Sequence, residues 1–203
     1  STAFHSADLA LYRNRVTELI TLQDELTPAI GPYDPTSDGY LFGVTGWINS
    51  EQIYTGYGAE LDLELYPVIG LEVFANLTLM TVLEETPGNR SVRDESASQV
   101  KLNAGVIYRS PWRADLSLLA NYTGAQEWRL REFDDAGDLV TVPASVEPWT
   151  ILGSRFGYRP LANESLELSL TGWNLMALDQ GVREHPKGQR VGPRVYGSIR
   201  LDF

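Results

Sequence analysis

The 203-residue chain contains no cysteine, which excludes a disulfide framework, a thiol nucleophile and a thiolate metal site. Histidine is nearly absent as well. His5 and His185 lie near opposite ends of the chain, a spacing that argues against a histidine-based zinc site. No Ser-His-Asp arrangement follows from the spacing of the remaining residues. The sequence therefore predicts a protein that is not an enzyme, with no catalytic residue, no cofactor and no metal site.

Positive charge and long apolar runs are also scarce. The 16 Lys and Arg residues are outnumbered by 27 Asp and Glu residues, and the formal net charge of −11 argues against nucleic-acid binding, which needs a basic face. No run reaches the roughly 18 apolar residues that a membrane-spanning helix requires. This excludes a helical membrane protein but leaves open a transmembrane β-barrel, whose strands alternate apolar and polar residues.

What the chain has instead is a hydrophobic period of two. The final stretch "VYGSIRLDF" alternates apolar or small residues with polar or amphipathic ones, which is typical of a strand with two chemically different faces. The same pattern recurs through the chain. It predicts eight strands, at residues 7–22, 57–67, 71–79, 100–109, 114–122, 149–159, 166–175 and 195–203.

The connections between these strands alternate in length. "YPVIG", "RSPWRA" and "RPLANES" are tight turns, whereas long polar loops occupy about residues 23–52, 84–98, 130–147 and 175–193. Segregation by length is typical of outer-membrane barrels and is not required of a soluble β-sandwich. The sequence thus predicts an all-β fold: an antiparallel up-and-down transmembrane β-barrel segment of about eight strands, with short periplasmic turns and long extracellular loops.

Alternation assigns the charged residues of the strands to one side, which in a barrel faces the lumen. An arginine on a lipid face costs roughly 2–4 kcal/mol near the bilayer midplane. The first strand is therefore oriented with Arg13 and Arg15 inward and Tyr12 outward, where the arginines could pair with the acidic row of strand 57–67. The predicted lumen-facing residues are Arg13, Arg15, Glu60, Asp62, Glu64, Lys101, Arg109, Arg155, Glu167 and Arg200.

Aromatic residues gather at both ends of the strands, as in the interfacial girdles of membrane proteins, although Trp and Tyr also favour strands in general. The predicted girdle residues are Tyr57, Tyr66, Trp112 and Tyr158. The acidic "EFDDAGDLV" and the basic "GVREHPKGQR" lie in long loops, where they fit either ligand contact or a solvated loop tip. The candidate extracellular ligand residues are Trp47, Asp134, Asp135, Arg183, His185 and Arg190.

Three stretches together resemble one family. "YTGYGAELDLELYPVIGLEVFANLTL" resembles a strand, turn and strand of the TonB-dependent outer-membrane receptors, and "KLNAGVIYRSPWRADLSLLANYTG" is similar to the hairpin that follows. The residues from "LGSRFGYRPLANES" onward resemble the family's closing segment, so that the resemblance covers residues 7–203. It implies that Ile199, Leu201 and Phe203 belong to a barrel-assembly signal, with Ser198 where that signal often has Gly.

Family members have a 22-stranded barrel with a plugged lumen. The resemblance implies that residues 1–203 form a carboxy-terminal barrel segment, with the plug and the earlier strands absent. The implied function is energised uptake of a scarce, bulky nutrient (siderophore, cobalamin or oligosaccharide) by a fragment or one chain of a split receptor in the bacterial outer membrane. The implied partners are the lipid bilayer or lipopolysaccharide, the remaining barrel strands and plug, and a TonB-type energy-coupling protein.

Two alternatives stay open from the sequence. Eight strands can close into a self-contained outer-membrane barrel with a structural, adhesion or small-pore role. A soluble β-sandwich binding module would also show alternating strands. Partition into detergent separates the sandwich from the two barrels, and the presence of partner chains separates the barrels from each other.

Overall fold

The computed structural model describes residues 4–22, 33–34, 39–40, 46–134, 139–177 and 182–202; Asp135 and Phe203 lie outside this part. Within it, every regular element is a β-strand. The chain divides into a larger unit (Ser1–Tyr12, Tyr57–Thr81 and Asp94–Phe203) and a smaller unit (Arg13–Gly56 and Val82–Arg93). Among the described residues, no helix has the length and apolar character needed to cross a membrane.

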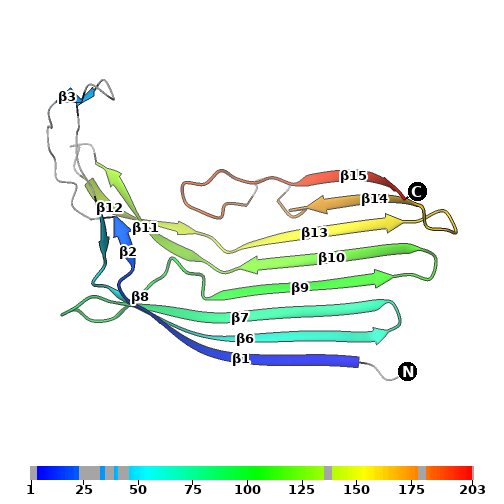
Figure 1. Cartoon of the computed structure of the whole chain (residues 1–203), viewed down its shortest axis with the longest axis horizontal. Helices are drawn as coiled ribbons and strands as arrows, with labels where there is room; N and C mark the ends of the chain where they lie inside the picture. The colour runs from blue at the N-terminus through cyan, green and yellow to red at the C-terminus, as the bar shows by residue number, and fades with distance from the viewer. Residues whose placement is uncertain are drawn as a thin grey trace. The chain divides into compact units, whose positions relative to one another are not determined.

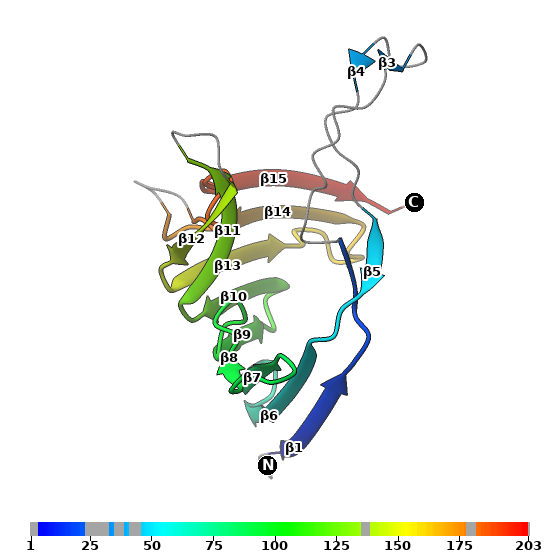
Figure 2. The same ribbon diagram turned by 90° about the vertical axis from the view of Figure 1, so that its left-hand side faces the viewer.

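The larger unit is built on one antiparallel sheet whose strands follow a curved path (Figures 1 and 2). Strands β1 and β15 each have one neighbour, so the described sheet is open at both edges. This confirms the predicted all-β antiparallel class. The order is β1 (Phe4–Val16), β6 (Ile53–Val68), β7 (Leu71–Glu85), β9 (Val100–Arg109), β10 (Ala114–Thr123), β13 (Trp149–Tyr158), β14 (Leu166–Trp173) and β15 (Arg194–Leu201).

Three tight turns, β6–β7, β9–β10 and β13–β14, lie at the same end of the sheet as the start of β1 and the end of β15 (Figure 1). Gly70 closes the first turn with a φ of 85°, a conformation that suits glycine. Its carbonyl oxygen accepts a hydrogen bond from the Arg109 backbone N–H at 2.7 Å, which joins the turn to β9. In the second turn, the Ser110 side-chain oxygen accepts hydrogen bonds from the backbone N–H groups of Trp112 and Ala114.

The predicted loop at 130–147 is wrong in part, because a β-hairpin occupies most of it. β11 (Gln126–Phe133) pairs with β12 (Leu139–Val146), with Gln126 opposite Val146. Pro143 and the acidic cluster before it made this stretch look like a loop. In a two-stranded ribbon every strand is an edge strand, where proline is tolerated.

The smaller unit also contains short strands, and all but the first of them lie where the sequence predicted loops. β2 (Ile20–Leu22) pairs with β5 (Trp47–Asn49), β3 (Tyr33–Asp34) pairs with β4 (Gly39–Tyr40), and β8 (Val92–Arg93) pairs with the end of β7. The predicted strand 7–22 is divided as well. β1 ends at Val16, and Glu18 adopts a φ of 56°, which is incompatible with an extended strand.

The strand register gives the sheet an apolar side and a polar side. A transverse row on the apolar side runs through Leu71, Tyr108, Leu116, Phe156 and Leu170, one residue opposite the next. The neighbouring row on the polar side contains Glu72, Ile107, Ser117, Arg155 and Thr171.

Among the residues that the structure describes, no layer covers the apolar side. Leu170 is 55% exposed and Ile199 is 73% exposed. The buried hydrophobic residues in the described part are Val146, Ile151 and Val182, and Ile151 lies on the polar side, opposite Asn121. The sheet therefore presents a broad apolar surface to its surroundings instead of packing it into a core, and an exposed apolar surface of this kind marks contact with another apolar phase or partner.

Candidate functional site

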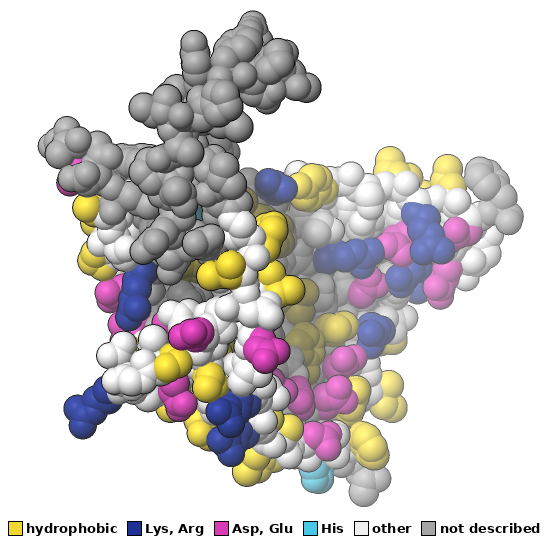
Figure 3. Space-filling view, turned by 60° about the vertical axis from the view of Figure 1, so that its left-hand side comes forward, with side chains coloured by type: hydrophobic (Ala, Val, Ile, Leu, Met, Phe, Trp, Pro, Cys, Tyr) yellow, Lys and Arg dark blue, Asp and Glu magenta, His cyan; other side chains and the backbone are white. Residues whose placement is uncertain are grey.

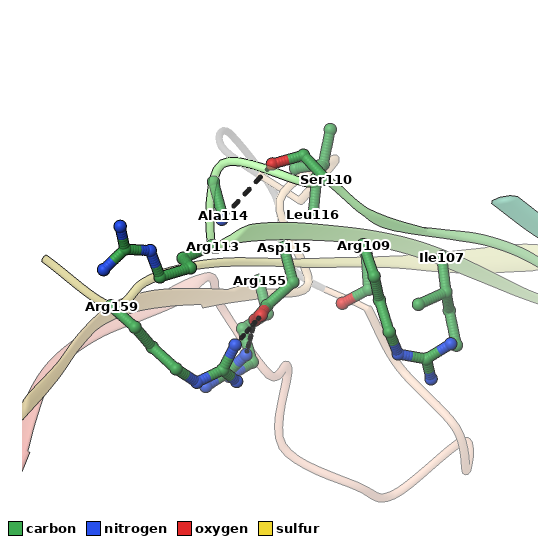
Figure 4. A pocket seen from close by; sticks show the side chains of 10 residues that line it. Ile107, Arg109, Ser110, Arg113, Ala114, Asp115, Leu116, Arg155 and Arg159 are labelled. Atoms are coloured by element: carbon green, nitrogen blue, oxygen red, sulfur yellow. Dashed lines mark hydrogen bonds and ion pairs between the residues drawn. The ribbon is translucent and has the colours of Figure 1, made fainter. Parts of the chain in front are cut away.

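A network of four charged side chains lies on the polar side, close to the tight turns. Arg155 of β13 bonds Asp115 of β10 at 2.9 Å and also bonds Glu167 of β14. Arg159, in the turn after β13, contacts Asp115 at 3.1 Å and Glu167 at 3.1 Å. Figure 4 shows Arg155 and Arg159 converging on Asp115. Two guanidinium groups and two carboxylates thus join three strands through alternating charges.

The network is partly shielded from solvent. The side chains of Asp115 and Glu167 are only 14% and 13% exposed, so each carboxylate depends on its arginine partners for the hydrogen bonds it lost with water. The nearby Asp115 carboxylate raises the pKa of the Arg159 guanidinium above its ordinary value, with a further contribution from Glu167. Figure 3 shows basic and acidic side chains interleaved over the receding end of the sheet, a pattern typical of mutual neutralisation.

A cavity of about 320 Å³ adjoins this network. β9, β10, β13 and the turns beside them contribute its lining, which includes Arg109, Arg113, Asp115, Arg155 and Arg159. In Figure 4, Arg109, Arg155 and Arg159 extend to the side of the sheet that carries Asp115, whereas Arg113 extends away. The cavity is therefore lined by guanidinium groups on the polar side.

The other residues predicted to share this side are spread along it. Asp62 accepts a hydrogen bond from the Asn76 side chain, which places the acidic row Glu60, Asp62 and Glu64 on the polar side by alternation. Arg109 contacts Glu72 at 3.4 Å. Two further members of the predicted set lie at register positions of the polar side: Lys101 opposite Thr78, and Arg200 opposite Glu167.

The orientation predicted for the first strand is wrong. The Tyr12 ring occupies the space where a Cβ of Gly58 would stand, and Gly58 alternates in phase with Asp62. Tyr12 therefore lies on the polar side. Arg13 and Arg15 alternate with Tyr12, so their side chains lie on the opposite side of the strand. The orientation of β1 follows from Gly58, whose lack of a side chain leaves room for the Tyr12 ring.

The position of Tyr66 also differs from the girdle prediction. Its hydroxyl donates a hydrogen bond to Glu64 at 3.2 Å, and its ring centroid lies 6.0 Å from that of Phe4. Tyr66 thus shares the polar side with Glu64. The other girdle residues carry exposed rings: Tyr57 in β6, Trp112 in the β9–β10 turn and Tyr158 at the end of β13. Of the predicted assembly residues, Ile199 and Leu201 lie exposed in the edge strand β15.

A second cavity, of about 660 Å³, lies at the opposite end of the larger unit. It is formed by the corner between β12 and β13 and by the segment that follows β14. Trp149 and Met176 supply apolar surface, whereas Glu147, Arg183 and Arg190 supply charge. Two of the candidate ligand residues, Arg183 and Arg190, are thereby brought to one cavity although seven positions separate them.

Hydrogen bonds, a ring contact and an ion pair hold the segment after β14 in place. Asn174, fully buried with a φ of 55°, donates a side-chain hydrogen bond to the Val191 carbonyl at 2.6 Å. Val182 and Val191 pair through their backbones. The His185 ring packs edge-on against Trp128 of β11 at 4.7 Å, and Lys187 forms an ion pair with Glu132 of the same strand. These contacts hold the arginines at the cavity.

The remaining candidate ligand residues do not line this cavity. His185 contacts Trp128, Asp134 lies beyond the end of β11, and Trp47 is exposed in the smaller unit. Asp135 lies outside the described residues. Asp115, Arg159, Trp149 and Met176 are not among the predicted site residues. Alternation nevertheless places two of them on the polar side, because Asp115 falls in phase with Ser117 and Arg159 falls in phase with Arg155.

Solved structures share this arrangement of strands. The ferripyoverdine receptor of the outer membrane of Pseudomonas aeruginosa matches 98% of this chain with 25% of its own, at 13% identity and a TM-score of 0.66. The ferric enterobactin receptor of P. aeruginosa matches 97% with 29% of its own, at 20% identity and a TM-score of 0.63. The FrpB iron transporter of Neisseria meningitidis matches 97% with 28% of its own, at 14% identity and a TM-score of 0.58.

The chain has the fold of part of a receptor barrel. The structural neighbours are TonB-dependent outer-membrane receptors, so the fold implied by the resemblance is confirmed. This chain spans between a quarter and a third of the length of each receptor named above, and identities of 13–20% carry the likeness in fold alone. No protein-family model and no curated protein matches the chain.

Proposed function

We propose that the chain forms the carboxy-terminal wall segment of a TonB-dependent receptor barrel in a bacterial outer membrane, as a fragment or as one chain of a split receptor. The intact assembly takes up a scarce, bulky nutrient of the siderophore, cobalamin or oligosaccharide class. The energy-coupling protein acts through a plug that another part of the assembly supplies. The observation that carries the proposal is a receptor-like sheet that has one exposed apolar side and, within the described ranges, two edge strands with no second neighbour.

The exposed apolar side supports a lipid-facing wall. A β-sandwich packs the apolar sides of two sheets against each other. Here the described part of the larger unit holds one main sheet, and Phe156, Leu170 and Ile199 remain at least half exposed. Lipid or lipopolysaccharide acyl chains would cover this side, whereas Lys101, Arg155 and Glu167 would face the lumen of the barrel.

The open edges favour a segment over a self-contained barrel. A closed barrel has no unpaired edge, because its first and last strands bond to each other. β1 and β15 are not neighbours in the described sheet. The unpaired backbone groups of both strands would therefore be satisfied by the remaining strands of the receptor.

A membrane-fractionation experiment tests the proposal. We expect the native protein to extract from outer membranes only with detergent, to partition into the detergent phase, and to bring with it the plug and the remaining barrel strands, as detected by mass spectrometry. A folded chain in the aqueous phase would indicate a β-sandwich. A heat-modifiable chain that folds alone in micelles, without any partner, would indicate a self-contained barrel.

The cavity that Arg183 and Arg190 line would contribute to ligand contact at the extracellular end. Two guanidinium groups beside Trp149 favour an anionic ligand with an aromatic or apolar surface. In the assembled receptor, we expect Arg183→Gln to weaken binding of an anionic ferric tricatecholate chelate and to leave neutral cobalamin unaffected. Arg194→Gln is the matched control, because Arg194 packs over the Trp173 ring and does not line the cavity. Equal losses in both variants would overturn this assignment.

A further inference from the structure

The cavity beside the charge network has more hydrogen-bond donors than acceptors. Each guanidinium group carries five N–H donors. Arg155 and Arg159 direct donors to Asp115 and Glu167. Within the described part of the chain Arg109 has one ionic contact, with Glu72 at 3.4 Å, and its side chain is 64% exposed. Most of the Arg109 donors therefore remain available to a group in the cavity.

The charges around the cavity are paired. Asp115 and Glu167 balance Arg155 and Arg159, and Glu72 balances Arg109 through that single contact. Glu164, which lies 3.9 Å from Arg159, and Arg113, whose side chain extends away from the polar side (Figure 4), are both exposed to solvent and therefore screened. The spare guanidinium donors, and not a net positive charge, would therefore hold an anion in the cavity.

We propose that this cavity binds one oxyanion, a carboxylate or a phosphate group, which contacts Arg109 on one side and Arg155 on the other. The planar fork of a guanidinium group matches the paired oxygens of either anion. About 320 Å³ is ample room for such a group, and Figure 4 shows both arginines extending to the same side of the sheet. The site lies at the tight-turn end, separate from the cavity of Arg183 and Arg190.

Calorimetric titration of the protein purified from membranes, with whatever chains accompany it, tests the proposal. The probes are inorganic phosphate and N-acetylaspartate, in low-chloride buffer. We expect saturable binding that Arg109→Gln weakens about tenfold, the effect of losing one charge-assisted hydrogen bond. Arg109→Lys keeps the charge but loses the fork, so it gives an intermediate loss.

Lys101→Gln is the matched control. Lys101 lies on the same strand and on the polar side, eight residues from Arg109, or about 27 Å at 3.4 Å per residue. That separation exceeds the Debye length of about 8 Å at physiological salt, so binding should stay within about twofold of the unsubstituted protein. Tighter binding of N-acetylaspartate would identify an acidic side chain as the natural occupant, and tighter binding of phosphate a free phosphate. Absence of binding, or equal binding to Arg109→Gln, would overturn the oxyanion site and leave the proposed receptor function unaffected.

Discussion

At the scale of single residues, four charged side chains connect neighbouring strands on the polar side of the sheet. Asp115, Arg155, Arg159 and Glu167 each satisfy two partners, and the carboxylates are largely hidden from water. Removing one member of such a network leaves the others with unsatisfied donors or acceptors, which costs more than a surface ion pair contributes. The network therefore joins β10, β13 and β14 beyond their backbone hydrogen bonds.

Glu167→Gln tests this role. The substitution removes the charge that both arginines share, and Asp115 is then the one largely shielded carboxylate that both arginines contact among the described residues. We expect the free energy of unfolding to fall by about 1–3 kcal/mol, measured by urea titration in micelles or vesicles.

Glu164→Gln provides the control in the same part of the chain. Glu164 lies 3.9 Å from Arg159 and is 58% exposed, so its removal should change stability by less than about 0.5 kcal/mol. Similar losses for the two variants would mean that the network contributes nothing beyond ordinary surface charge.

At the same scale, hydrophobic alternation predicted the side of the sheet correctly for some residues and incorrectly for others. Lys101, Arg155, Glu167 and Arg200 could be assigned to the polar side from sequence because charge and period agree in their strands. Tyr12 could not, because its position depends on the missing side chain of Gly58 in a different strand. Alternation within one strand cannot predict a contact with a residue of another strand.

At the scale of elements, the tight turns set the register of the sheet. Gly70 has a φ of 85°, and the space its side chain would occupy is already filled by the carbonyl oxygen of Arg109. Its own carbonyl accepts the Arg109 N–H at 2.7 Å. One glycine therefore permits both the turn between β6 and β7 and its close approach to β9.

Gly70→Ala should destabilise the protein by about 2–5 kcal/mol, of which about 1–2 kcal/mol comes from the left-handed conformation and the rest from the clash with the Arg109 carbonyl. Gly88→Ala separates the two terms, because Gly88 has a φ of 80° but no atom within 4 Å of the added Cβ. Its cost should stay at about 1–2 kcal/mol in the same urea titration. Equal costs would show that the approach to Arg109 is easily relaxed.

Elements differed in how well the sequence predicted them. Strands flanked by tight turns, such as β9 (Val100–Arg109), matched their predicted bounds because apolar alternation and turn residues coincide there. The β11–β12 hairpin was missed because Pro143 and the acidic residues that precede β12 are typical of loops, although Val140, Val142, Ala144 and Val146 alternate with Thr141, Pro143 and Ser145. Turn-like residues inside a strand therefore masked a period of two that the sequence does carry.

At the scale of the whole molecule, a sheet with eight strands along its main path and one apolar side should have a stability that depends on the surrounding medium. Val106 and Asn103 lie on the same strand, β9, near its middle. Val106 faces the apolar side, opposite Val73 and Leu118, whereas Asn103 faces the polar side, opposite Asn76 and Asn121. Both are exposed, so neither substitution needs to open a packed core.

In lipid vesicles, Val106→Arg should lower the free energy of unfolding by about 2–4 kcal/mol, because it places a charge near the bilayer midplane. Asn103→Arg should have an effect close to zero, since its side chain would enter a wet lumen. Urea titration of both variants in vesicles, repeated in micelles of a zwitterionic detergent, measures the difference. If the two arginines cost the same, the apolar side of this sheet does not face lipid, and a wall segment of an outer-membrane receptor is the wrong assignment for this chain.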